Sequence, residues 1–107
     1  MYLVNTTFGV DGPLAADFAE YIHTRFIPAA TSGSGLYAPL LSRVMEQHPE
    51  EGAPESHTMA LQMRARDAKA LERYCAETSP ALLQAIRERW GDRVVSFTTV
   101  LEVISRP

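Results

Sequence analysis

The first part of the chain contains two stretches with different patterns of apolar residues. Residues 2–10 are rich in β-branched and aromatic types, a composition that predicts a β-strand. Beyond Asp11-Gly12-Pro13 the apolar positions recur every four residues, which predicts an amphipathic helix of about four turns. These positions are Leu14, Phe18, Ile22 and Phe26. Proline suits the first turn of a helix because its missing N–H needs no partner there, and we expect Pro28 to end this helix.

The middle of the chain predicts two strands joined by an acidic loop. The first strand runs from about Leu36 to Glu46, and Pro39 within it indicates an edge position or a bulge, because proline cannot donate to the ladder. Residues 47–56 contain prolines, glutamates and a histidine, and they predict a solvated hairpin loop. Residues 57–65 predict the next strand.

A second helical region and a last strand follow. Asp67 is a suitable N-cap for the helix that comes after it. Ser79-Pro80 has the form of a new N-cap and first helical position, so we expect this helix to be broken or restarted there. Gly91-Asp92 ends the helical region, and residues 94–104 predict the last and strongest strand.

The resulting order β-α-β-β-α-β predicts a ferredoxin-like α+β fold, with both helical regions on one face of a four-stranded antiparallel sheet. We expect residues 1–107 to form one such domain. A sheet with its other face in water should alternate apolar and polar residues, yet several strands carry apolar residues on both faces. In the last strand, one face has Val95, Phe97, Leu101 and Val103, and the other has Val94, Val100 and Ile104. The second face therefore needs a cover, and a second copy of the chain is the natural candidate.

Composition and charge narrow the possible partners. The chain has 10 basic and 13 acidic residues and a net charge of −3, which argues against a face that binds nucleic acid. No basic cluster suits an anionic membrane surface, and no apolar run approaches the roughly 18 residues of a membrane span. Since the N-terminus lacks the features of a cleavable signal, we expect a soluble, cytoplasmic protein. The single cysteine, Cys75, excludes an internal disulfide, and we expect it to be a buried structural thiol.

Several stretches, taken in order, carry a resemblance that spans nearly the whole chain. They are Tyr2–Thr7, Phe26–Pro28, Ala60–Met63, Leu71–Tyr74, Ser79–Leu82 and, closest of all, Arg89–Phe97. The pattern resembles a bacterial family of short proteins of unknown function within the dimeric α/β-barrel group of ferredoxin-like folds. This resemblance implies a homodimer whose two sheets face each other, and it implies no reaction. The wider group includes cofactor-independent monooxygenases, haem-degrading enzymes, lactone isomerases and ligand-sensing modules, so function must be argued from the site.

Four residues are candidates for binding a ligand: Asn5, His23, Tyr37 and Gln62. The haem-degrading branch has an asparagine in its first strand, and this resemblance implies that Asn5 faces a pocket between sheet and helices. The alternative is a polar strand residue bonded to backbone or water. His23 follows two alanines at helical spacing, and it either reaches a ligand or is a boundary histidine facing solvent. Tyr37 either lines the same cleft or packs, and Gln62 is a polar group that could serve a pocket from the third strand.

We predict no cofactor and no metal site. The histidines and glutamates of residues 48–57 fit no zinc spacing, and no Ser/His/Asp arrangement can be defended from the order of residues. We expect a homodimer that binds a small apolar or aromatic molecule between sheet and helices, and neither nucleic acid nor membrane. Two alternatives stay open: a cofactor-independent monooxygenase or haem-degrading enzyme, and a purely structural or regulatory dimer.

Overall fold

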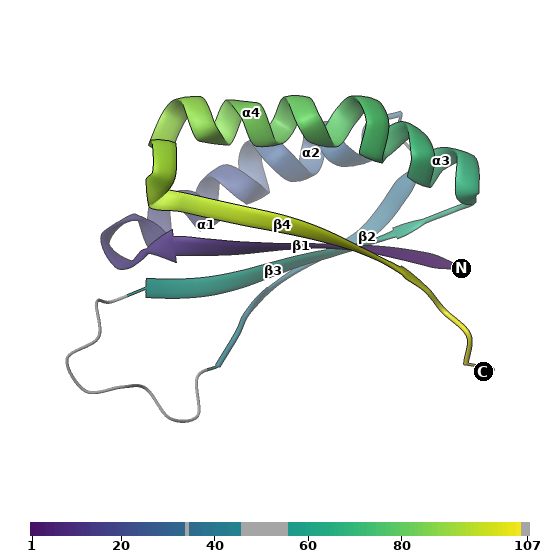
Figure 1. Ribbon diagram of the computed structural model, residues 1–107, viewed down its shortest axis with the longest axis horizontal. Helices are drawn as coiled ribbons and strands as arrows, with labels where there is room; N and C mark the ends of the chain where they lie inside the picture. Colours follow the sequence, from purple (N-terminus) through teal and green to yellow (C-terminus); the bar gives the residue numbers. More distant parts are fainter. Residues whose placement is uncertain (34, 46–55, 106–107) are drawn as a thin grey trace.

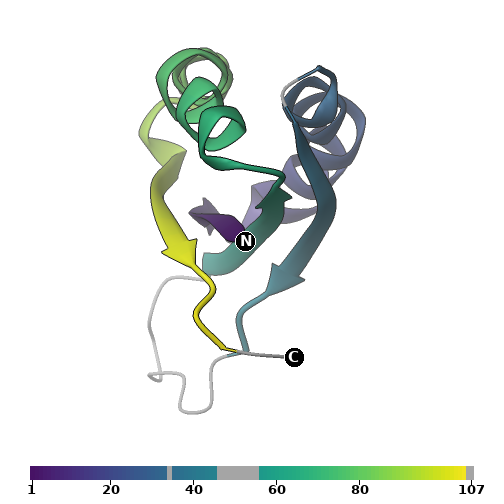
Figure 2. The same ribbon diagram turned by 90° about the vertical axis from the view of Figure 1, so that its right-hand side faces the viewer.

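Four strands form one antiparallel sheet in the order β2-β3-β1-β4 in a computed structural model that describes residues 1–33, 35–45 and 56–105. The elements are β1 (Tyr2–Asp11), α1 (Ala15–Tyr21), α2 (Ile27–Thr31), β2 (Leu36–Arg43), β3 (Ser56–Ala65), α3 (Ala68–Arg73), α4 (Ser79–Trp90) and β4 (Val94–Glu102). This order confirms the ferredoxin-like β-α-β-β-α-β fold class. All helices lie on one side of the sheet (Figure 1). They form two helical arms, the first made of α1 and α2 and the second of α3 and α4, which lie side by side above the sheet (Figure 2).

The core fills the space between the helices and the sheet. In β1 the even-numbered residues from Val4 to Val10 are buried, and the residues between them are only half-buried. The Phe8 ring packs edge-on against Phe18 and Phe26, with ring centroids 5.0 Å and 6.0 Å apart. Leu61 and Met63 of β3 complete the same inner layer, so the helix-facing side of the central strands is fully covered.

Each helical arm contains a π-helical turn directly before a proline. In the first arm the turn Ile22–Phe26 joins α1 to α2, and the Ile27 N–H donates to the Ile22 carbonyl. The expectation that Pro28 ends the helix is therefore wrong, because helix α2 continues to Thr31. An i→i+5 bond widens the helix at the point where proline removes an ordinary i→i+4 bond, so the chain passes the proline without breaking.

The second arm uses the same arrangement. The π-helical turn Tyr74–Thr78 joins α3 to α4, and the Ser79 N–H donates to the Tyr74 carbonyl, just before Pro80. The expected break at Ser79-Pro80 is therefore wrong, since Ser79 is buried inside a continuous helix and makes no side-chain cap. The predicted cap at the start of the arm is confirmed: Asp67 Oδ1 accepts a hydrogen bond of 2.8 Å from the Ala70 N–H.

Strand β2 is an edge strand with an irregularity at its proline. Its register against β3 shifts between Tyr37 and Leu40, and Ala38 in between has φ of +54°. This confirms the prediction that Pro39 marks an edge position or a bulge, since the strand lies at the edge and its register is irregular there. The strand ends at Arg43, and residues 47–55 of the predicted acidic loop 47–56 lie outside the described residues, as does Glu46 at the end of the predicted strand.

Cys75 lies on the outside of the second helical arm, which corrects the expectation of a buried thiol. Its neighbour Tyr74 occupies the inward position of that turn and is fully buried, so the next side chain along the helix points away. Partial desolvation still raises the pKa of the thiol. Among the described residues, no helix has the length and apolar character needed to cross a bilayer.

Candidate functional site

Three of the four candidate residues lie on the sheet face that the helices leave uncovered. In β1, Asn5 alternates with buried Val4 and Thr6, so its side chain points away from the helices. Gln62 lies directly opposite Asn5 on β3, and Leu40 of β2 lies opposite Gln62. Tyr37 sits further along β2, opposite Arg64. The structure therefore gathers Asn5, Tyr37 and Gln62 on one surface, although it is not the surface that we expected.

The expectation that Asn5 faces a pocket between sheet and helices is wrong in this structure. The position next to it, Thr6, points to the helices and has an exposed fraction of 0%. The Asn5 Nδ2 donates instead to the Thr7 Oγ1, 3.2 Å away on the same outer face. The expected position of Asn5 was the reason for comparing this chain with haem-degrading enzymes, and the observed position removes that reason.

His23 does not join the other candidates. It lies in the π-helical turn of the first arm, with its side chain exposed. The helical arm that carries it lies on the other side of the sheet from the uncovered face (Figure 1). Of its two interpretations, the structure agrees with a histidine that faces solvent.

The uncovered sheet surface, called the open face here, has a polar centre and apolar borders. The central strands β1 and β3 contribute mainly small or polar side chains, whereas the edge strands β2 and β4 contribute large apolar ones. Leu40, Val95 and Phe97 are 59%, 61% and 63% exposed. The open face consists of Leu3, Asn5, Thr7, Gly9, Tyr37, Leu40, Ser42, Thr58, Ala60, Gln62, Arg64, Val95, Phe97, Thr99 and Leu101.

A second feature lies on the helix side of the edge strand β4. There a groove of about 380 Å³ runs between α4 and β4. Leu83, Ile86 and Val94 give it an apolar wall. Arg87, Asp92 and Ser96 add polar groups to its lining. This combination of apolar wall and few polar groups is typical of small-molecule sites.

Three buried hydroxyl groups, those of Thr6, Tyr74 and Ser79, lie in the neighbouring part of the core, and the exposed Thr98 adds a fourth at its edge. Thr98, on the same side of β4 as Ser96, has its Oγ1 3.2 Å from the Oγ1 of Thr6. The Tyr74 hydroxyl is buried and has no hydrogen-bond partner within the described part of the chain. Burial raises the pKa of Tyr74 to about 12, and the nearby hydroxyls of Ser79 and Thr6 limit that rise. Tyr74 therefore stays protonated at neutral pH and can donate a hydrogen bond.

These neighbouring hydroxyl groups were not identified from the sequence, although the position of Thr6 in the first strand was an indication. Thr6 shares its parity with Val4 and Phe8, so it is a polar residue on the apolar side of the first strand. Tyr74 and Ser79 could not be recognised in the same way, because tyrosine and serine at helix positions have many roles. Within the described ranges, no group of three or more His, Cys, Asp or Glu side chains is placed to hold a metal ion.

Comparison with known proteins agrees with the fold and gives no activity. Residues 1–104 match the family described as a domain of unknown function, DUF4286, which confirms the resemblance seen in the sequence. No curated protein matches the sequence.

Solved structures with the same fold are distant in sequence. A Deinococcus radiodurans protein provisionally classed as an antibiotic biosynthesis monooxygenase is 16% identical, with a TM-score of 0.65 over 100% of this chain and 96% of that one. HapK from Hahella chejuensis is 14% identical, with a TM-score of 0.65 over 100% and 96%. A protein from an uncultured marine organism, described as a dimeric ferredoxin-like protein, is 10% identical, with a TM-score of 0.65 over 99% and 97%. At these identities the likeness concerns the fold alone.

Proposed function

Because the chain belongs to the DUF4286 family, a domain of unknown function, we propose its function from geometry alone. Two copies pair through their open faces as a homodimer, and each copy takes up a small apolar or aromatic molecule in the groove between α4 and β4. The observation that carries the proposal is the apolar border of the open face, in a chain whose own helices cover the other face of the central strands.

The apolar border supports self-association. Large exposed side chains on both edge strands, among them Leu40 and Phe97, form a patch of the kind that marks protein interaction surfaces. A second copy presents the same patch, as two-fold pairing requires. The marine protein of similar fold is described as dimeric, and this analogy favours a copy of the chain over an unrelated partner.

The polar centre of the open face fits such a pairing if it is satisfied across the interface. The Asn5 and Gln62 amides lie side by side on neighbouring strands, where covering them without partners would be costly. The same amides of the second copy, or water held between the sheets, can supply the missing hydrogen bonds. We infer a dimer with contacts at its borders and a partly hydrated middle.

The groove between α4 and β4 supports ligand binding. Its volume of about 380 Å³ lies within the range of about 300–1,000 Å³ that is common for small-molecule pockets. Ile86 and Val94 provide apolar surface for a ring, and Arg87 provides a charged group at the lining. The groove lies mainly on the helix side of β4 and shares only Val95 with the open face, so dimerisation leaves its inner wall at Ile86 and Ser96 free.

The dimer is tested by light scattering on a dilution series. We expect a mass of twice the 11.9 kDa of one chain for the wild type, and a mass of one chain for Phe97→Asp, because the carboxylate would be buried between two sheets. Val100→Asp is the matched control, since Val100 is on the same strand with its side chain on the other face. A wild type that is a monomer at all concentrations would refute the pairing, as would equal dissociation by both variants.

The groove is tested separately with indole and 1-naphthol as aromatic probes. Titration followed by amide NMR should shift the signals of groove residues such as Ile86 and Ser96, and Ser96→Phe should abolish the shifts by filling the space. Ala85→Phe, which adds the same ring to an exposed position of α4, should leave them unchanged. Shifts confined to the open face, or no shifts, would refute the ligand site.

A further inference from the structure

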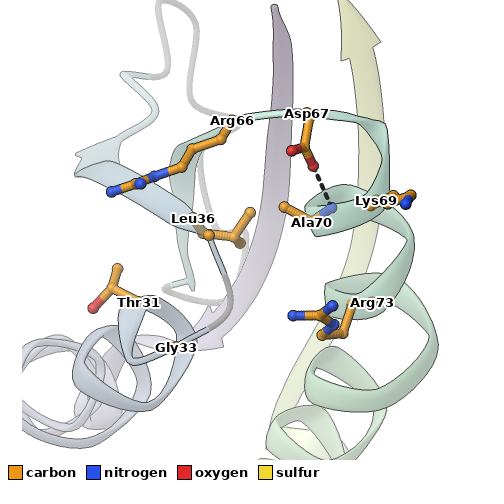
Figure 3. A pocket seen from close by; sticks show the side chains of 9 residues that line it. Thr31, Gly33, Leu36, Arg66, Asp67, Lys69, Ala70 and Arg73 are labelled. Carbon is orange, nitrogen blue, oxygen red and sulfur yellow. Dashed lines mark hydrogen bonds between the residues drawn. The ribbon is translucent and has the colours of Figure 1, made fainter.

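A second cavity, on a different part of the molecule, is lined by cationic side chains. It has a volume of about 470 Å³ and lies between the end of the first helical arm and the start of the second (Figure 3). Arg66, Lys69 and Arg73 line it together with a single acidic residue, Asp67. Its side chains thus sum to a charge of +2, in a chain whose net charge is −3.

These cations are not engaged elsewhere. Within the described residues, the side chains of Arg66, Lys69 and Arg73 form no hydrogen bond, ion pair or cation–π contact. Other arginines do have partners: Arg93 pairs with Asp11 at 3.1 Å, and Arg89 lies over the rings of Tyr21 and Trp90. The three cations that line the cavity are therefore available to a ligand, as are the exposed Arg25, Arg43 and Arg64 elsewhere on the surface.

Backbone contacts hold the walls of the cavity together. The Arg66 N–H donates to the Gly35 carbonyl at 3.2 Å, which ties the end of β3 to the loop before β2. Gly35 has φ of +81°, and a Cβ on it would lie 2.7 Å from the Ala70 Cβ. Only glycine permits this close approach, so the loop is seated against the first turn of α3.

The direction of the arginines matters for what the cavity can bind. In Figure 3, Arg66 and Arg73 extend toward the side of the cavity that carries Thr31, while Lys69 points to the other side of the helix. The Asp67 carboxylate has one oxygen occupied by the Ala70 N–H at 2.8 Å. Leu36 and Ala70 supply an apolar floor between these groups.

We propose that this cavity is a binding site for small molecules that carry phosphate groups. The planar forks of Arg66 and Arg73 match phosphoryl oxygens in bidentate geometry, and the Lys69 charge at the rim adds long-range attraction. The apolar floor at Leu36 accommodates the organic part of such a molecule. The site shares no residue with the open face or with the α4–β4 groove, so it is independent of the function proposed above.

The proposal is tested by calorimetric titration of the full chain with pyrophosphate at constant ionic strength, so that charge screening does not change. We expect saturable binding, weakened about tenfold or more by Arg73→Gln and by Arg66→Gln, because each removes charge-assisted hydrogen bonds. Arg25→Gln, which removes the same charge from an exposed position outside the cavity, should bind as the wild type does.

Three outcomes would overturn the proposal. Absence of pyrophosphate binding would remove the site. An equal loss in Arg25→Gln and Arg73→Gln would reduce the effect to general surface charge. If citrate bound as tightly as pyrophosphate, the cavity would be a general anion site, and the proposed preference for phosphate groups would be refuted. All three arginines are exposed, so circular dichroism should show unchanged folding in the variants.

Discussion

The two faces of the sheet are built on opposite plans. On the covered face the central strands carry the large apolar side chains, and Val4, Phe8 and Leu61 have no exposed surface. On the open face the central strands carry mainly polar or small groups, with Leu3 as the exception, and the other large apolar residues lie on the edge strands, as Phe97 does on β4. The first plan gives a dry core that one chain completes. The second arrangement gives a polar centre with apolar borders, which differs from one half of a packed hydrophobic core.

The difference teaches that strand alternation alone does not identify a core. Both faces carry apolar residues, so the sequence predicts two covered surfaces. Where the apolar residues stand within each face decides how that surface is covered. A central apolar cluster seals against helices of the same chain, whereas an apolar rim around Asn5 and Gln62 suits a partner that touches at the borders.

The largest effect is expected for a truncation on the covered face. Phe8→Ala removes a fully buried ring that packs against Phe18 and Phe26, and it should lower the free energy of unfolding by about 3–5 kcal/mol in urea denaturation. The folded fraction should keep the mass of the wild type, in contrast to Phe97→Asp. A change of mass in Phe8→Ala with little loss of stability would contradict the distinction between the two faces.

A smaller effect, visible only at high pH, is expected for the buried phenol of the covered face. The pKa of Tyr74 is raised by burial from 10.0 to about 12, so above pH 10 the unfolded chain loses this proton more readily than the folded one. The wild type should therefore lose about 1 kcal/mol of stability from this group by pH 11, and the loss should be absent in Tyr74→Phe.

Tyr37→Phe, on the open face, is the control for that measurement, and it should keep the pH-dependent loss. Near pH 8, Tyr74→Phe should be as stable as the wild type or slightly more stable, because it removes a buried hydroxyl without a partner. Destabilisation by more than about 1 kcal/mol at that pH would show that the hydroxyl is hydrogen-bonded after all.

The smallest effects are expected for two adjacent threonines that point to opposite faces. Thr6→Val removes the hydroxyl 3.2 Å from that of Thr98 in a fully buried position and should cost about 1 kcal/mol. Thr7→Val removes the acceptor of Asn5 on the half-buried open face and should cost less than about 0.5 kcal/mol. Urea denaturation of both variants checks the pair, and equal costs would argue against a wetter open face.

The fold could be predicted from the sequence because local signals agreed with one another. Runs of β-branched and aromatic residues located the first strand, a four-residue apolar spacing located the first helix, Asp67 marked a helix start, and Pro39 marked an irregular edge. The failures at Pro28 and Ser79-Pro80 share one cause. A proline is tolerated when the preceding turn widens to i→i+5 bonds, and residue identity alone does not signal that widening.

The sites were less predictable, because they depend on which segments meet. Asn5 was placed by analogy with a branch of the fold, although its parity against Val4 already indicated the opposite face. The cationic cavity joins Arg66 and Arg73 to a loop about thirty residues earlier in the chain, and only the tertiary structure shows that meeting. The clustering of the cations Arg66, Lys69 and Arg73 in one short stretch was the signal that the sequence offered.

The paired π-helical turns fix the length of each helical arm. An i→i+5 bond holds one residue more than an i→i+4 bond, so the turns at Ile22–Phe26 and Tyr74–Thr78 each act as a built-in insertion. Deleting one residue there would restore regular helix and keep the residues after it in the same rotational register, because the wide turn had absorbed the extra residue. Buried Ala30 in the first arm and Ile86 in the second would still face the sheet. Relatives that keep this packing with a regular helix should therefore show a one-residue gap at the wide turn and nowhere else in the arm.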